Sequence, residues 1–444
     1  MLKKSGKTAI VIFLSLLLAA CAPPVRVLPT PSATVAVSTL MPTYTPRSDL
    51  TPTPSRTPPP TIVPSSTPQR VYHSPLQAGQ ALLLTGVHMA DAASGWGLES
   101  QGLLLHTLDG GLTWKDVTPS DGEYQAGGFY ALDALTAWAT PSCYQDCPQA
   151  PGSASLWHTT DGGQHWTALP PLCLNGDCGY TPSESATLYV PRSLQFLDEK
   201  NGWLMAVVGH AISQNRYRLY HTMDGGLSWD FVLDNQTGPV VSIASGVAFT
   251  DETNGWFAVS QVGGAESPAP NWYVYHSSDA GQTWEPLNLP LPPIFLPTTF
   301  TLNPYWCGAS AVTAKPALSI DLSFYCDVYE PDARPRYFFH FHSADGGRSW
   351  QAWQVPGGGG SAFLSPRKGW RLRPIDPVLS VLELTLDGGL HWGSLSTVGW
   401  AGSLDFIDSW NGWAVATSSS GTSLLHTQNA GRTWSEIKPV VAGP

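Results

Sequence analysis

One short pattern recurs seven times in this 444-residue chain and limits its fold more than any other feature. The first copy is His-Thr-Leu-Asp-Gly-Gly-Leu-Thr-Trp at residues 106–114. The seven copies end at Trp114, Trp166, Trp229, Trp284, Trp350, Trp392 and Trp434. The intervals between these tryptophans are 52, 63, 55, 66, 42 and 42 residues. A minimal unit of about 42 residues with variable insertions is typical of one propeller blade. The repeat therefore predicts an all-β fold, a seven-bladed β-propeller with four-stranded antiparallel blades.

A second signal precedes most copies in the same phase. It is the pair Gly95-Trp96, Gly202-Trp203, Gly255-Trp256, Gly369-Trp370 and Gly412-Trp413. The second copy has Ala137-Trp138 instead, and in the fifth copy the pair is lost or disguised. Each unit then predicts four short strands. In the last copy these are 403–406, 412–417, 423–427 and 433–437.

The acidic position of the repeat has a structural explanation. It is filled by Asp109, Asp161, Asp224, Asp279, Asp345 and Asp387, and by Asn429 in the last copy. Between the third and fourth strands the chain must reverse tightly. There an Asp or Asn side-chain oxygen can accept backbone N–H groups, and glycine can adopt positive φ. The closing tryptophan can pack on the adjoining blade. We therefore interpret the repeated turns as architecture.

These residues carry a family resemblance over 81–437. The consensus Ser/Thr-x-Asp-x-Gly-x-Thr-Trp resembles the Asp-box, or BNR repeat, of sialidases and sortilin-type propellers. With the preceding Gly-Trp strand, it is most similar to the photosystem II assembly and stability factor family. The resemblance implies an extracytoplasmic seven-bladed propeller with a role in assembling a membrane complex. A role in photosystem II itself would require a photosynthetic host.

Histidine also recurs, three residues before the acid, which raises the question of a metal site. The positions are His106, His158, His221, His276, His342 and His426, with Leu384 in the sixth copy. Equivalent positions in different blades lie around a ring and cannot converge on one ion. The sequence therefore predicts packing at these histidines, and we expect no metal and no cofactor.

The N-terminus predicts export. Residues 1–20 combine three lysines with an apolar run and form a signal peptide. The tetrapeptide Leu18-Ala19-Ala20-Cys21 resembles a bacterial lipobox, which implies a lipid on Cys21. Residues 21–70 are rich in Pro, Thr and Ser and predict a disordered linker, leaving 71–444 for the propeller. We therefore expect an exported, extracytoplasmic domain that is anchored to the bacterial cell membrane by its N-terminal lipid.

Cysteine usage agrees with export. Seven cysteines less Cys21 leave six: Cys143, Cys147, Cys173, Cys178, Cys307 and Cys326. Their closeness in sequence suggests a Cys307–Cys326 disulfide, with the other four paired locally or across two neighbouring loops. A zinc site at those four is the alternative, and disulfides are favoured because exported proteins rarely keep free thiols.

Function is predicted to lie in the loops opposite the repeated turns, where the insertions gather. Aromatic and arginine side chains typical of interfaces occur there. They are Tyr144, Tyr180, Arg216, Trp272, Trp306, Arg334 and Arg336, with Asp146, Tyr217, Tyr305 and Tyr329. The formal net charge of −11 argues against nucleic acid. We expect a monomeric, non-catalytic scaffold for a protein or envelope-polymer partner.

The alternative is a carbohydrate-binding or glycan-hydrolysing surface protein. A sialidase needs an arginine triad and a Tyr nucleophile with a Glu partner. The Phe/Tyr-Arg-Ile-Pro motif of such enzymes is absent, and the nearest string, Val190-Pro191-Arg192, has the wrong order. A deep central pocket with two carboxylates and several arginines would favour hydrolysis. A broad aromatic surface would favour binding.

Overall fold

The computed structural model describes residues 74–119, 122–143, 153–173, 188–211, 214–239, 241–262, 274–290, 307–315, 319–327, 336–355, 360–376 and 379–443. The predicted signal peptide, the lipidation site Cys21 and the linker lie outside these residues and stay predictions. Within the described ranges, regular structure consists of strands and one short 3-10 turn, η1 (Ala126–Gly128). No helix in these ranges is long and apolar enough to cross a bilayer.

Seven antiparallel sheets form the blades, each built from four strands in chain order, with β7 left out of the second blade; this confirms the predicted fold class. The first blade contains β1 (Leu84–Met89), β2 (Gly95–Glu99), β3 (Leu104–Thr107) and β4 (Thr113–Asp116). The second contains β5 (Phe129–Ala131), β6 (Ala137–Ala139), β8 (Trp157–Thr159) and β9 (Thr167–Ala168). The third contains β11 (Val190–Phe196), β12 (Gly202–Ala211), β13 (Gln214–Thr222) and β14 (Asp230–Asp234). The fourth contains β15 (Val241–Phe249), β16 (Gly255–Val262), β17 (Val274–Ser277) and β18 (Glu285–Leu287).

The fifth to seventh blades repeat this pattern. The fifth contains β19 (Cys307–Lys315), β20 (Ser319–Asp327), β21 (Arg336–Ser343) and β22 (Gln351–Val355). The sixth contains β23 (Ser361–Phe363), β24 (Gly369–Pro374), β25 (Ser380–Thr385) and β26 (Gly393–Val398). The seventh contains β27 (Ala401–Phe406), β28 (Gly412–Ser418), β29 (Gly421–Thr427) and β30 (Ser435–Ile437), close to the four strands predicted for that copy. A separate pair, β7 (Ser153–Ala154) with β10 (Leu172–Cys173), adjoins the second blade's insertions.

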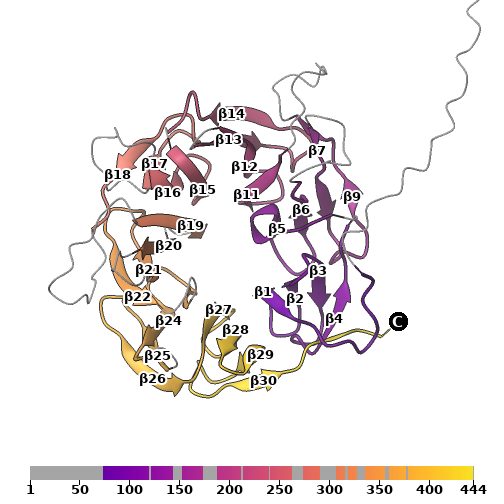
Figure 1. The fold of residues 1–444 in the computed structure, drawn as a ribbon, viewed down its shortest axis with the longest axis vertical. Helices are drawn as coiled ribbons and strands as arrows, with labels where there is room; N and C mark the ends of the chain where they lie inside the picture. Colours follow the sequence, from indigo (N-terminus) through magenta and orange to yellow (C-terminus); the bar gives the residue numbers. More distant parts are fainter. Residues whose placement is uncertain are drawn as a thin grey trace, which may run out of the picture. The chain divides into compact units, whose positions relative to one another are not determined.

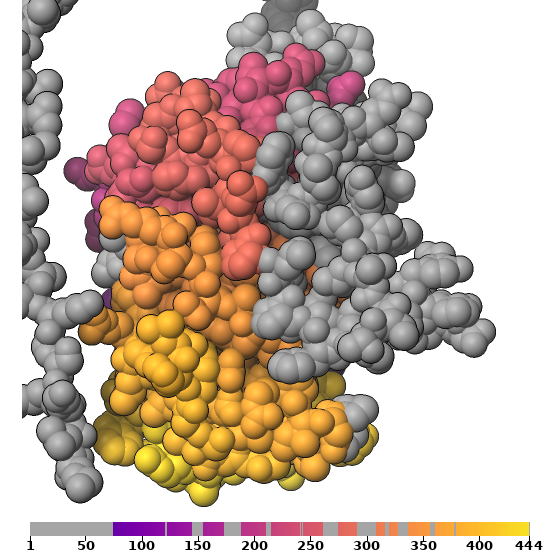
Figure 2. All heavy atoms as spheres, turned by 90° about the vertical axis from the view of Figure 1, so that its left-hand side faces the viewer, coloured from indigo at the N-terminus to yellow at the C-terminus, as the bar shows by residue number. Residues whose placement is uncertain are grey.

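The blades follow one another around a ring, with the first strand of each blade toward the centre (Figure 1). The ring is closed by the C-terminal strand β31 (Val440–Val441), which pairs in parallel with β4. The backbone N–H of Leu82 also donates to Pro439 O. Both ends of the propeller are therefore tied to the first blade. Figure 2 shows the outer side of the later blades packed in chain order.

The core lies between neighbouring blades. Its largest fully buried side chains are mostly the tryptophans of the Gly-Trp strands, Trp96, Trp138, Trp203, Trp256, Trp370 and Trp413. Several of these rings stack on a phenylalanine of the following blade: Trp138 on Phe196 and Trp370 on Phe406, both with ring centroids 3.8 Å apart. Glycine precedes every one of these tryptophans except Trp138, because a Cβ there would collide with the blade's own innermost strand. At Gly202 it would lie 2.6 Å from the ring of Phe196.

Candidate functional site

The repeated turns share one hydrogen-bond network. In the first, Asp109 Oδ1 accepts the Thr113 N–H at 2.8 Å, and Oδ2 accepts the Thr113 hydroxyl at 2.7 Å. The Thr107 hydroxyl donates to Asp109 and accepts the Gly111 N–H. Gly110 and Gly111 have φ values of 75° and 95°, which favour glycine. Asn429 replaces the acid in the last turn, and its Oδ1 accepts the Thr433 N–H at 2.9 Å.

The six acids of these turns are held as carboxylates. Burial opposes ionisation to differing degrees, but hydrogen bonds from the turn outweigh it and lower the pKa of every one of them. At Asp161 and Asp387 the pKa falls to about 2. Their oxygens are engaged within their own turns, so these acids are poor candidates for proton transfer or ligand binding.

Five of the repeated histidines pack on the tryptophan of their own blade. The ring centroids are 4.4 to 4.9 Å apart for Trp96–His106, Trp138–His158, Trp203–His221, Trp256–His276 and Trp413–His426. Burial lowers the pKa of all five histidines, which favours the neutral ring. Within the described residues, no group of three or more His, Cys, Asp or Glu side chains is placed so that it could hold a metal ion.

Hydrogen bonds from tryptophans connect the turn region of one blade to that of the next. The donors are the indole Nε1–H groups of Trp370, Trp413, Trp96 and Trp138. Their acceptors are Ala430 O, Gly110 O, Asp133 O and Gly225 O, at 2.9 to 3.0 Å. These bonds connect the sixth, seventh, first, second and third blades in order along one face, which we call the turn face.

The turn face carries exposed apolar side chains. Three turns have them on both sides of the acid: Leu108 and Leu112, Met223 and Leu227, and Leu386 and Leu390, each 55% to 68% exposed. The turns between first and second strands add Leu135 in the second blade and Trp410 in the seventh, also more than half exposed. We call these eight residues the apolar arc. It spans the five blades that the tryptophan bonds connect.

The repeat does not require apolar residues at these positions. The equivalent positions of the second turn hold Thr160 and Gln164, and those of the fourth hold Ser278 and Gln282. The last turn holds Gln428 and Arg432 there, yet it has the same network around its Asn. Since the turn folds equally with polar tips, the leucines and methionine of the arc are not explained by architecture.

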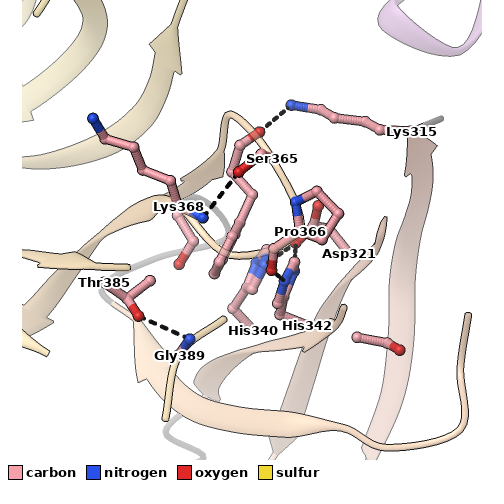
Figure 3. Close-up of polar contacts among 12 residues, drawn as sticks. Lys315, Asp321, His340, His342, Ser365, Pro366, Lys368, Thr385 and Gly389 are labelled. Atoms are coloured by element: carbon pink, nitrogen blue, oxygen red, sulfur yellow. Dashed lines mark hydrogen bonds and ion pairs between the residues drawn. The ribbon is translucent and has the colours of Figure 1, made fainter. Parts of the chain in front are cut away.

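The fifth blade departs from the repeat in its second strand, β20. Asp321 pairs there with His342 of β21, and in every other blade the residue equivalent to Asp321 is a tryptophan. Its Oδ1 lies 2.8 Å from His342 Nδ1 and 2.9 Å from His340 Nε2 (Figure 3). The other ring nitrogen of His342, Nε2, lies 2.9 Å from the carbonyl oxygen of Pro366. All three ionisable side chains are buried.

Electrostatics hold Asp321 in its charged form. Burial alone would raise the pKa of this carboxyl, but hydrogen bonds and charge from His340 and His342 outweigh it, and the pKa lies well below its ordinary value. Both nitrogens of His342 face acceptors, the carboxylate and a backbone carbonyl. Only the imidazolium can donate to both, so Asp321 and His342 form a buried ion pair whenever that ring is protonated.

A cavity of about 240 Å³ lies beside this cluster. Its polar lining includes Asp321, His340, Lys315 and Asp405. Burial raises the pKa of Asp405, opposed by nearby His88 and by the Met89 N–H, which donates to Asp405 Oδ2 at 2.7 Å. The described residues that line the cavity include two carboxylates but no arginine. The lining thus has only part of the set that would favour hydrolysis.

Most of the predicted partner-binding residues lie outside the residues that the structure describes. Tyr144, Tyr180, Trp272, Trp306 and Arg334 lie outside the described residues, as do Asp146, Tyr305 and Tyr329. Arg216 and Arg336 are exposed on β13 and β21, in the third and fifth blades, which are not neighbours. Arg336 lies over the ring of Tyr325 at 4.5 Å. Tyr217 is fully buried, and its hydroxyl donates to Pro239 O at 2.6 Å, so it serves packing.

Two of the predicted disulfide cysteines are brought face to face. Cys307 and Cys326 are directly opposite on β19 and β20. Cys143 and Cys326 each take part in a disulfide bond. Cys173 ends β10, while Cys147 and Cys178 lie outside the described residues. The pairing of the remaining cysteines stays open.

Fold and site together define the class of protein, a seven-bladed β-propeller with an apolar arc on one face.

No protein-family model matches the chain, and no curated protein matches it. Among solved structures it is similar to a GH74 xyloglucanase from Xanthomonas campestris, at 15% identity over 82% of this chain and 55% of that one, with a TM-score of 0.51.

Two further solved structures are similar over most of their length. One is YCF48 bound to D1 peptide, at 16% identity over 80% of this chain and 95% of that one, with a TM-score of 0.43. The other is a PL25 ulvan lyase, at 11% identity over 80% and 95%, with a TM-score of 0.45. At these identities the likenesses concern the fold alone.

Proposed function

We propose that this protein is a cell-envelope scaffold that binds a protein partner through the apolar arc. The observation that carries the proposal is the exposure of Leu108, Leu112, Met223 and Leu227 at turn tips where sister turns are polar. Large apolar side chains gathered on one exposed face of a folded domain mark interaction sites. The repeated acids and histidines are engaged in the scaffold, which favours binding over catalysis.

A protein partner fits this surface better than a bilayer does. The arc's tips alternate with carboxylates, since Asp109, Asp224 and Asp387 each lie between two of them in sequence. Helices and loops that insert into anionic membranes combine apolar residues with lysine and arginine. Carboxylates beside the tips would be repelled by anionic headgroups, whereas a protein can offer complementary cations.

Attachment to the membrane is a separate part of the proposal. The lipobox at Cys21 and the linker over 21–70 would hold the propeller outside the cytoplasm. Cys21→Ser is expected to abolish incorporation of radiolabelled palmitate and to release the protein from the membrane fraction. Retention of label in that variant would contradict lipidation at Cys21, without bearing on the arc.

Site-specific photocrosslinking tests the arc in whole cells of the native host. A benzoylphenylalanine at Leu112 is expected to capture a discrete protein. The matched control places the same group at Gln282, the equivalent tip of the fourth blade. Equal capture at both positions, or none at either, would contradict the proposal. Adducts with lipid at Leu112 would assign the arc to the bilayer instead.

The loop-rich face opposite the turns, which the sequence predicts as the binding surface, stays a prediction. The glycan-hydrolysing alternative is tested in parallel by incubating the purified chain with xyloglucan and with sialyl-lactose. Turnover of either substrate would reverse the ranking of the two functions.

A further inference from the structure

The fifth blade has exchanged three residues at once where it meets the sixth. The register places Asp321 where other blades have tryptophan, and Ile320 where they have the small residue before it. Ile320 pairs with Ala314, and Ala314 takes the position that phenylalanine fills in four other blades. Where those blades pair phenylalanine with glycine, the fifth blade pairs alanine with isoleucine, so the combined side-chain volume of the pair is conserved. No larger residue replaces the volume of the missing tryptophan.

The missing indole leaves space between blades. In the third and sixth blades the tryptophan covers a phenylalanine of the next blade, with centroids 4.0 and 3.8 Å apart. In the fifth blade the ring of His342 covers Phe363 instead, with centroids 3.5 Å apart. Asp321 does not fill the rest of the volume, and the cavity of about 240 Å³ begins there.

The cavity lies along the innermost strands of three blades. Thr313 and Lys315 of β19, Ser361 of β23 and Asp405 of β27 all line it. Thr313 and Lys315 are exposed, so its wall is accessible from solvent. The volume is below the about 300–1,000 Å³ of typical drug-sized sites. The cavity therefore suits one small ring and excludes a chain of several.

The charges of the lining are already balanced. Asp321 is bonded to His340 and His342. Asp405 lies in the field of His88 and Lys315. A charged ligand would have to break one of these pairs, which is costly in a partly buried site. The lining instead offers hydroxyl, imidazole and carboxylate groups beside apolar walls from Phe339, Phe363 and Phe406.

We propose that this cavity binds a single neutral sugar ring, with Asp321 and His340 contacting its hydroxyl groups. A pyranose combines hydroxyl groups at its edge with apolar C–H faces, which matches a lining of both kinds. None of the eight residues of the apolar arc lines the cavity. The sugar site and the protein-binding proposal can therefore succeed or fail independently.

Saturation-transfer difference NMR tests the proposal on the full-length chain in detergent. The panel contains glucose, galactose, mannose, rhamnose and N-acetylglucosamine, with glucuronate and glucosamine as charged analogues. At least one neutral sugar is expected to give a signal, with at least tenfold weaker binding of both charged analogues. Absence of binding by every neutral sugar, or preference for a charged one, would overturn the proposal.

A matched pair of variants locates the binding. Ala311→Trp fills the cavity from an exposed position of β19 without replacing Asp321 or its histidines, and is expected to abolish the signal. Ile243→Trp, at an exposed position on the innermost strand of the fourth blade, is expected to keep it. Survival of the signal in Ala311→Trp would overturn the assignment. Should that variant not fold, the His340 and His342 ring resonances of the wild type give the second readout, and unchanged shifts at saturating sugar refute the site.

Discussion

Replacing Asp321 with alanine is expected to destabilise the propeller more than any replacement of a repeated-turn acid. The carboxylate bonds two imidazoles at 2.8 and 2.9 Å, and the side chains of His342 and His340 are only 0% and 11% exposed. Removing the carboxylate leaves two buried imidazole N–H donors without an acceptor, at about 1–3 kcal/mol each. The alanine variant should therefore lose about 2–6 kcal/mol of unfolding free energy at pH 7.

The contribution of Asp321 to the free energy of unfolding should also depend on pH, in a direction that its pKa determines. The pKa of Asp321 in the folded protein lies below the ordinary value of 3.8. Its contribution is therefore complete above that value and is lost as the pH falls toward the folded-state pKa. The difference between wild type and variant should therefore shrink as the pH falls below about 4.

Urea unfolding followed by tryptophan fluorescence measures both effects. Asp345→Ala, which removes the half-buried turn acid of the same blade, is the control and should cost about 1–2 kcal/mol, since the same three hydrogen bonds are lost as in the other repeated turns. An Asp321→Ala loss no larger than that of the control would refute a stabilising role for this cluster. So would a difference between wild type and variant that stays undiminished below about pH 4.

Other replacements test the scaffold itself. Gly202→Ala should cost about 1–3 kcal/mol because its Cβ would meet a phenylalanine ring at 2.6 Å. Gly86→Ala, with nothing within 4 Å of the new Cβ, should stay within about 0.5 kcal/mol in the same urea titration. Asp109→Ala should cost about 1–2 kcal/mol, measured as a shift in urea midpoint, since three hydrogen bonds to its carboxylate are lost; an unchanged midpoint would contradict the structural role of the turn. Non-reducing peptide mass mapping should recover Cys307 linked to Cys326, and linkage of either to another cysteine would refute that pairing.

The sequence predicts the ring because its signals are local and repeated. The acid, the glycines and the closing tryptophan of each turn lie within nine residues, as at 106–114, so their hydrogen bonds can be anticipated without tertiary information. Asn429 illustrates this, since an amide oxygen serves as the carboxylate does.

The candidate site was harder to predict because its signals are departures from the repeat. No motif marks Ile320-Asp321 as the counterpart of Gly-Trp, and only strand register reveals it. Tyr217 stands near an insertion and suggested a contact residue, yet the chain folds its ring inward. The sequence shows leucine at Leu112 and Leu227, where the equivalent positions of other turns hold glutamine or arginine. Their significance depends on exposure, which the sequence does not record.

Binding through the apolar arc is tested most directly by the affinity of the protein captured at Leu112 for tip variants. Leu112→Gln with Leu227→Gln gives two tips the residue that sister turns carry. Burying a leucine contributes about 1.5–3 kcal/mol, so the double variant should bind at least about 100-fold more weakly. Gln164→Ala, at the equivalent tip of the blade between them, should bind as the wild type does. An affinity of the double variant within twofold of wild type would contradict binding through the arc.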